Sequence, residues 1–130
     1  MARRDYSEDD DFYSQGFEKR GVVSVWVELK DHGAEKNIDT LQDLCGVGYY
    51  RLSDQESNSF NDEFAYLPDL LPALSYSASY INEVVAAAQN KGIHKARRIV
   101  VQYDFAYDPA VIVREIDKNA LFLGVFCYTV

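Results

Sequence analysis

Cysteine is scarce in this chain: of its 130 residues only Cys45 and Cys127 carry a thiol, and neither belongs to a Cys-x-x-Cys pair or a spaced Cys/His set. The sequence therefore offers no zinc-ligand pattern and no disulfide framework. A chain of this length buries a sufficient core without such cross-links. We expect both thiols to be reduced and buried, as is usual in a cytoplasmic protein.

Long apolar runs are missing as well. No stretch reaches the roughly 18 apolar residues that a membrane span needs. Arg3 and Arg4 near the start are not followed by the apolar segment of a secretory signal. Since 48% of the residues are hydrophobic and 14% aromatic, the composition indicates a folded globular protein. We expect a cytoplasmic location and no association with a membrane.

Residue sets that perform catalysis are also absent. The two histidines are His32, in a polar loop, and His94, in the basic segment "KGIHKARR". Neither is paired in sequence with a nucleophilic serine or cysteine. The "GVG" at 46–48 is too short for a phosphate-binding loop and lacks its lysine. We expect no enzyme activity, no cofactor and no metal ion.

Negative charge, in contrast, is abundant and unevenly spread. The net charge is −8, and residues 21–76 hold ten acidic but three basic side chains, whereas residues 77–130 hold five acidic and six basic ones. An acidic field repels nucleic acid and favours association with a basic protein. The same charge would also serve merely to keep the protein soluble, and the charge alone leaves these two interpretations open.

The first half of the chain predicts one clear strand. In "VVSVWVEL", residues 22–29, every second side chain is apolar and mostly β-branched, and the side chains between them are mixed. This alternation predicts a strand buried on one side. A short helix is expected to begin at Asn37 and end at Gly46. We expect a strand over 47–52 and a loop over 53–63.

The second half predicts two helical segments and two strands. Pro68 and Pro72 bracket a helical turn, and an apolar stripe predicts a helix closed by Gly92; the stripe comprises Ile81, Val84, Val85 and Ala88. Residues 97–108 alternate again, with five side chains on one face: Ile99, Val101, Tyr103, Phe105 and Tyr107. Residues 121–130 are apolar on both faces, which is typical of a central strand, and Gly124 within them indicates a bulge or a close backbone contact.

These segments together predict one α+β domain. We expect a small mixed or antiparallel sheet of three to four strands, with helices packed mainly on one face. The domain is expected to span residues 21–130, preceded by a flexible acidic leader over residues 1–20.

The stretch "QYDFAYDP", residues 102–109, contains the most suggestive pair of carboxylates, Asp104 and Asp108. On a strand these residues stand about 13 Å apart, which is too far to share one metal ion or to act as a glycosidase pair. Asp108, before a proline, is expected to form a turn. Asp104 is expected to be solvated or bonded to a neighbouring loop. The remaining catalytic alternative is a metal-dependent or acid/base hydrolase that uses Asp104 with acids of the 53–63 loop.

The best candidate for a binding surface is a segment rich in tyrosine and carboxylates. Rigid aromatic rings supply contact area in protein interfaces, and acids supply electrostatic matching. The candidate partner-binding residues are Tyr49, Tyr50, Asp54, Glu56, Asp62, Glu63 and Tyr66. The alternative is that one of the two adjacent tyrosines is buried in a strand and that the acids form a solvated loop.

Five segments together resemble a known family. "VVSVWV", "LCGVGYY", "SYSASYINEVVAAAQNKGI", "ARRIVVQYDFAYDP" and "FLGVFCY" occur in an order and spacing similar to the immunity protein 22 family of bacterial polymorphic toxin systems. The resemblance spans roughly residues 21–128. Its most specific part is "YDFAYDP" followed by "FLGVF" near the end of the chain.

The resemblance implies an α+β protein without enzyme activity, held in the cytoplasm, that binds a cognate toxin domain and blocks it. Toxins in such systems are often nucleases, whose surfaces are basic because they bind phosphate. An acidic, tyrosine-rich binder suits a partner of that kind, and from the negative charge we expect no direct contact with nucleic acid.

Overall fold

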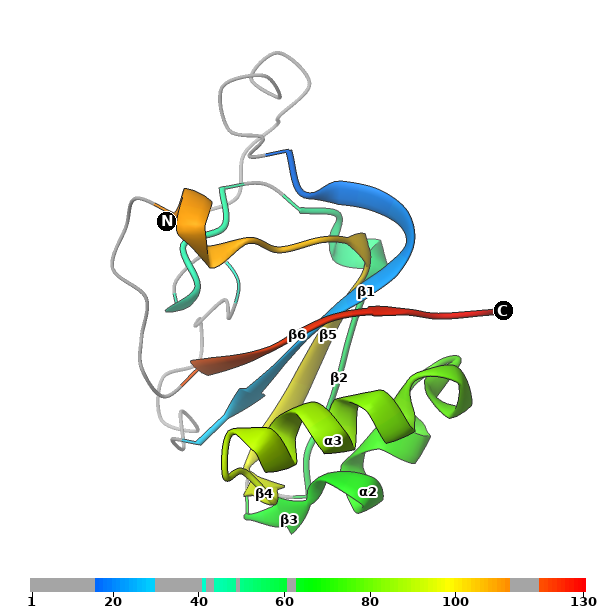
Figure 1. Cartoon of the computed structure of the whole chain (residues 1–130), viewed down its shortest axis with the longest axis vertical. Helices are drawn as coiled ribbons and strands as arrows, with labels where there is room; N and C mark the ends of the chain where they lie inside the picture. The colour runs from blue at the N-terminus through cyan, green and yellow to red at the C-terminus, as the bar shows by residue number, and fades with distance from the viewer. Residues whose placement is uncertain (1–15, 30–40, 42–43, 49, 61–62, 113–119) are drawn as a thin grey trace.

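A four-stranded antiparallel sheet forms the centre of the fold (Figure 1). This computed structural model describes residues 16–29, 41, 44–48, 50–60, 63–112 and 120–130. Within them the strand order is β2-β5-β1-β6. The strands are β1 (Glu18–Glu28), β2 (Gln55–Asn58), β5 (Arg98–Phe105) and β6 (Ala120–Cys127). The expected α+β class and small antiparallel sheet are confirmed.

Two helices lie together on one side of this sheet (Figure 1). They are α2 (Leu67–Leu70), which continues into a 3-10 turn at Leu71–Ala73, and α3 (Ile81–Asn90). A two-stranded sheet of β3 (Ala65–Tyr66) and β4 (Lys95–Ala96) flanks them. The predicted helical turn between the two prolines and the predicted helix before Gly92 are both confirmed.

Each face of the sheet buries its own core. The helix-side core lies under α2 and α3 and comprises Val23, Val25, Val27, Leu67, Leu70, Leu71, Leu74, Tyr80, Val84, Ala88, Ala96, Ile99, Val101, Tyr103 and Leu123. The aromatic core covers the opposite face and comprises Phe17, Trp26, Leu41, Leu44, Cys45, Val47, Tyr50, Val100, Phe105, Tyr107 and Ala120. Strand β1 is therefore buried on both sides, not on one, and even Ser24 and Glu28 are buried. Full burial of one large apolar side chain contributes about 1.5–3 kcal/mol.

An irregularity at Asp104 decides which face the end of β5 covers. Asp104 has φ +55°, the left-handed region, and the pairing of β1 with β5 shifts register at this point. Before it, Tyr103 packs into the helix-side core; after it, Phe105 and Tyr107 pack into the aromatic core. The expectation that these three rings share one face is wrong, because a single left-handed residue breaks the two-residue period.

The carboxylate of Asp104 holds this bulge in place. Its Oδ1 accepts a hydrogen bond from the backbone N–H of Gly21, at 2.9 Å, and another from the hydroxyl of Tyr128, at 2.8 Å. Gly21 itself has φ +86°, a conformation that glycine adopts without strain. One side chain thus connects β1, β5 and the residues that follow β6; Asp104 was expected to be solvated or bonded to a neighbouring loop, and one of its two bonds instead goes to strand β1.

Ser24 completes the pairing beyond the bulge. Its hydroxyl donates to the carbonyl of Phe105 and accepts from the N–H of Tyr107, at 2.9 Å. These backbone groups lie where β5 leaves the regular ladder, so they need a partner once they are buried. A fully buried serine in the middle of β1 is explained by this task.

Strand β6 differs from its prediction in position. It lies at an edge of the described sheet and pairs with β1, whereas β1 and β5 occupy the central positions. The predicted bulge is confirmed: the register shifts opposite Val25 and Trp26, and Gly124 has φ +144°. Beyond that bulge Cys127 is exposed, so its expected burial is wrong, although both cysteines are free thiols as expected.

Three predicted boundaries also need correction. The strand expected over 47–52 is not observed among its described residues; a 3-10 turn at Leu52–Asp54 leads into β2, inside the predicted loop. β2 is a short polar edge strand, and such a strand shows no apolar alternation. The domain also begins earlier than residue 21, because Phe17 is buried and β1 starts at Glu18.

The bulge makes a prediction about stability. Asp104→Ala removes two hydrogen bonds and leaves a residue that tolerates left-handed φ poorly, so we expect a loss of about 2–3 kcal/mol in the free energy of unfolding. Asp104→Asn keeps an acceptor and a residue type that visits this region, and should cost about 1 kcal/mol. Urea denaturation followed by circular dichroism measures both, and equal losses for the two variants would contradict this role.

Candidate functional site

The seven predicted partner-binding residues do not form one cluster. Tyr49 and Asp62 lie outside the described residues. Tyr50 is 4% exposed and belongs to the aromatic core, so its side chain is not part of a contact surface, and its inclusion is corrected. The apolar neighbours of this tyrosine in the fold come from segments distant in sequence, which the local pattern does not reveal. The other four residues fall in two separate places.

Asp54 and Glu56 lie beside a group of tyrosines at the margin of the helix-side core. Their negative charges contribute, after burial, to raising the pKa values of Tyr128 and Tyr103, respectively. Asp104 also lies in this region, as the acceptor for Tyr128. We call the surface formed by Asp54, Glu56, Tyr76, Asp104 and Tyr128 the tyrosine–acid patch. Two acids of the 53–63 loop, Asp54 and Glu56, therefore belong to the same region as Asp104.

Two buried tyrosines support the patch from below. The hydroxyls of Tyr80 and Tyr103 are 2.8 Å apart and hydrogen-bonded, and the hydroxyl of Tyr103 donates to the carbonyl of Ser75. Burial is the main cause that raises the pKa of each phenol above its ordinary value. These hydroxyls fix the backbone of the turn that carries Tyr76.

Tyr76 is the most unusual residue of the patch. Its φ is +59°, which is uncommon for a bulky residue, and its side chain remains 46% exposed. Its ring stacks on Tyr128, with centroids 5.7 Å apart and planes 23° apart, and meets Tyr103 edge-on. The neighbouring N–H of Ser75 donates to Glu56 Oε1 at 2.8 Å. Sequence reasoning missed Tyr76, because nothing in "LSYSAS" marks a left-handed tyrosine.

Tyr128 connects the exposed ring to the bulge. Burial, then its hydrogen bond to Asp104 and the charges of Asp104 and Asp54, raise the pKa of its phenol to about 12. The guanidinium of Arg51 lies 3.6 Å from Asp54 on the exposed rim. The patch therefore presents a stacked pair of rings among three carboxylates.

Glu63 and Tyr66 lie at the other end of the helix layer, on and beside the small sheet. Tyr66 pairs with Lys95, whereas Glu56 pairs with Val101, six residues farther along the β4–β5 segment. At about 3.3 Å per residue the two places are about 20 Å apart. Here Tyr66 is 54% exposed, and the ammonium of Lys95 lies over its ring, 4.6 Å from the ring centroid.

Asp108 has the structural role that its sequence context predicts. Its carboxylate accepts from the N–H of Ala110 at 3.0 Å and caps the 3-10 turn Pro109–Val111. Within the described residues, no three His, Cys, Asp or Glu side chains are arranged to hold a metal ion. The same part of the chain contains no helix long and apolar enough to cross a membrane.

Comparisons with protein-family models, with curated proteins and with solved structures found no significant match to this chain. The fold and the surface therefore define this chain as an α+β domain with an exposed patch of aromatic and acidic side chains.

The raised pKa of Tyr128 makes a prediction about alkaline stability. The folded state favours the neutral phenol, so this contribution is complete below pH 10, the ordinary value, and is lost between pH 10 and about 12. Tyr128→Phe should cost about 1 kcal/mol at pH 8, where the bond to Asp104 is lost. Between pH 10 and 12 its free energy of unfolding should fall less than that of the wild type. Urea denaturation at each pH measures this, and parallel curves for the two proteins would contradict it.

Proposed function

We propose that this chain is a non-catalytic binding protein of the immunity type, which neutralises a basic toxin domain through the tyrosine–acid patch. The observation that supports this most directly is Tyr76: an exposed ring, kept in a left-handed conformation and stacked on a second ring. The nature of the partner rests on the resemblance to immunity proteins and on the net charge of −8.

The strain at Tyr76 supports a binding role. A non-glycine residue in the left-handed region costs about 1–3 kcal/mol and persists only when its surroundings hold it there, commonly at functional sites. Here the surroundings are the bond from Ser75 N–H to Glu56 and the rings of Tyr103 and Tyr128. A ring fixed before binding loses little entropy when a partner packs against it.

The charges around the ring favour a cationic partner. The carboxylate of Asp104 accepts from the hydroxyl of Tyr128 and so lies beside the stacked rings, and the charge of Asp54 is among the causes that raise the pKa of that phenol. A lysine or arginine side chain is attracted both by such carboxylates and by the face of a tyrosine ring. Attraction of this kind accelerates association and weakens as salt concentration rises.

Substitutions in the patch test the proposal with the toxin domain that we expect the adjacent gene to encode. Tyr76→Gly removes the ring but tolerates the left-handed backbone, so the fold should persist while affinity falls about 30-fold, or 2 kcal/mol. Asp54→Lys should slow association and reduce its dependence on salt. The matched control is Tyr66→Ala, an exposed tyrosine outside the patch, which should change affinity less than twofold. Calorimetry, stopped-flow mixing and survival of cells co-expressing both proteins give the readouts.

Two results would overturn the proposal. The first is an adjacent gene that encodes no toxic domain, or one that the wild-type chain neither binds nor neutralises. The second is full protection by a folded protein that carries both Tyr76→Gly and Asp54→Lys, because the binding surface would then lie elsewhere.

A further inference from the structure

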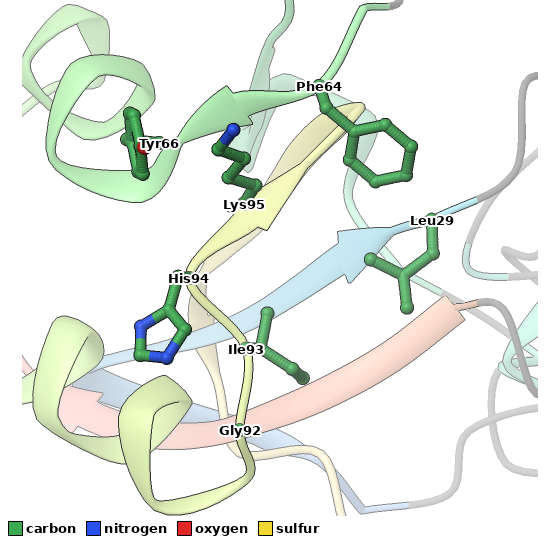
Figure 2. A pocket seen from close by; sticks show the side chains of 7 residues that line it. All are labelled: Leu29, Phe64, Tyr66, Gly92, Ile93, His94 and Lys95. Carbon is green, nitrogen blue, oxygen red and sulfur yellow. The ribbon is translucent and has the colours of Figure 1, made fainter.

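A second surface with different chemistry lies at the opposite end of the helix layer. Figure 2 shows side chains from three segments around an open hollow of about 530 Å³: Leu29 after β1, Phe64 and Tyr66 at β3, and Ile93, His94 and Lys95 leading into β4. A smaller hollow of about 170 Å³ shares Tyr66, Ile93 and His94 and continues along α2 and α3. We call the two together the β3–β4 groove.

The walls of this groove are apolar and accessible. Phe64 is 49% exposed and Tyr66 54% exposed, and Leu29 and Ile93 are only partly buried beneath them. Single exposed apolar side chains are common on protein surfaces, but two aromatic rings beside an apolar hollow mark a place where another chain can dock. The hollow is large enough for one or two aromatic side chains.

Two basic side chains lie at the rim of the groove, although the protein as a whole is acidic and Glu63 precedes Phe64 in the chain. Lys95 lies over the ring of Tyr66, and the guanidinium carbon of Arg97 lies 4.6 Å from the centroid of Phe64. Residues 94–98, "HKARR", contain three basic residues and a histidine and no acidic residue, in a chain of net charge −8. The occupant that suits this groove is thus a segment with aromatic anchors flanked by carboxylates, and a basic toxin would be repelled from it.

We infer that the β3–β4 groove receives residues 5–13, "DYSEDDDFY", of a second copy of this chain. This segment carries five carboxylates, three aromatic rings and no basic residue. Its aromatic side chains match the apolar hollow, and its acidic run matches Lys95 and Arg97. The acidic segment and the basic groove belong to the same sequence, so two copies of this chain can form the contact without any other protein.

The distance along the sheet assigns the two rings that follow the acidic run, Phe12 and Tyr13, to the groove of another copy and not to that of their own chain. Phe12 lies six residues before Glu18, which is at most about 20 Å of extended chain. Glu18 pairs with Phe105, and ten residues separate Phe105 from Lys95 along β5 and β4, about 30 Å. Two copies that exchange these segments reciprocally form a closed dimer with two-fold symmetry.

This inference does not depend on the proposed function, and its test uses the full-length protein without any toxin. Sedimentation equilibrium over a range of concentrations should show a monomer–dimer equilibrium that salt shifts toward monomer. Lys95→Glu, in the groove, and Asp9→Lys with Asp11→Lys, in the segment, should each weaken the dimer at least about tenfold. Lys91→Glu makes the same charge change outside the groove lining and should leave the dimer within about twofold of wild type.

Mixing the two kinds of variant provides the sharpest readout. The Lys95→Glu copy keeps a wild-type segment and the other copy keeps a wild-type groove, so the mixture should form a one-to-one dimer more readily than either variant alone. A protein that is monomeric at every concentration, a dimer that Lys95→Glu leaves unchanged, or a mixture that forms no mixed dimer would each overturn the inference. A dimer weakened by Lys95→Glu but not by the segment variant would also overturn it, because the occupant would then be another part of the chain.

Discussion

The carboxylate of Asp104 is the interaction on which the rest of this structure depends. It accepts from Gly21 N–H and from the hydroxyl of Tyr128, and so stabilises a left-handed residue in the second half of a central strand. That one backbone conformation transfers Phe105 and Tyr107 from the helix-side face to the aromatic core, where Trp26 packs against Tyr107 with ring centroids 5.1 Å apart. The aromatic core, to which Trp26 and Val100 belong by ordinary strand alternation, gains two further rings from this change of face.

The same carboxylate also connects the fold to the candidate binding surface. Tyr128, fixed by Asp104, provides the ring on which Tyr76 stacks, and the turn at Ser75 is bonded to Glu56 and Tyr103. The acids of the patch therefore have structural tasks as well as charge. A surface built in this way is rigid before a partner arrives, which is the property that lowers the entropic cost of binding.

Sequence reasoning succeeded where the relevant physics is local. The apolar period over Ile99–Tyr103 and the stripe along α3 both gave the correct element and the correct buried face, and Asp108 formed the expected turn. It failed where a partner distant in sequence decides the outcome. The left-handed Asp104 depends on a glycine 83 residues away, and the buried state of Tyr50 on a core assembled from several segments. The polar strand β2 is specified by its pairing with β5 rather than by its own pattern.

We propose that a partner binds at the tyrosine–acid patch, and amide hydrogen exchange measures directly whether this patch is covered in the complex. Exchange is measured on this chain alone and on the chain saturated with the toxin domain expected from the adjacent gene. Binding at the patch should slow exchange at Ser75–Ser79 and at Thr129, whose N–H donates to Ser79 Oγ beside the patch. Protection confined to the β3–β4 groove or to the aromatic-core face, with the 75–79 turn unchanged, would contradict it.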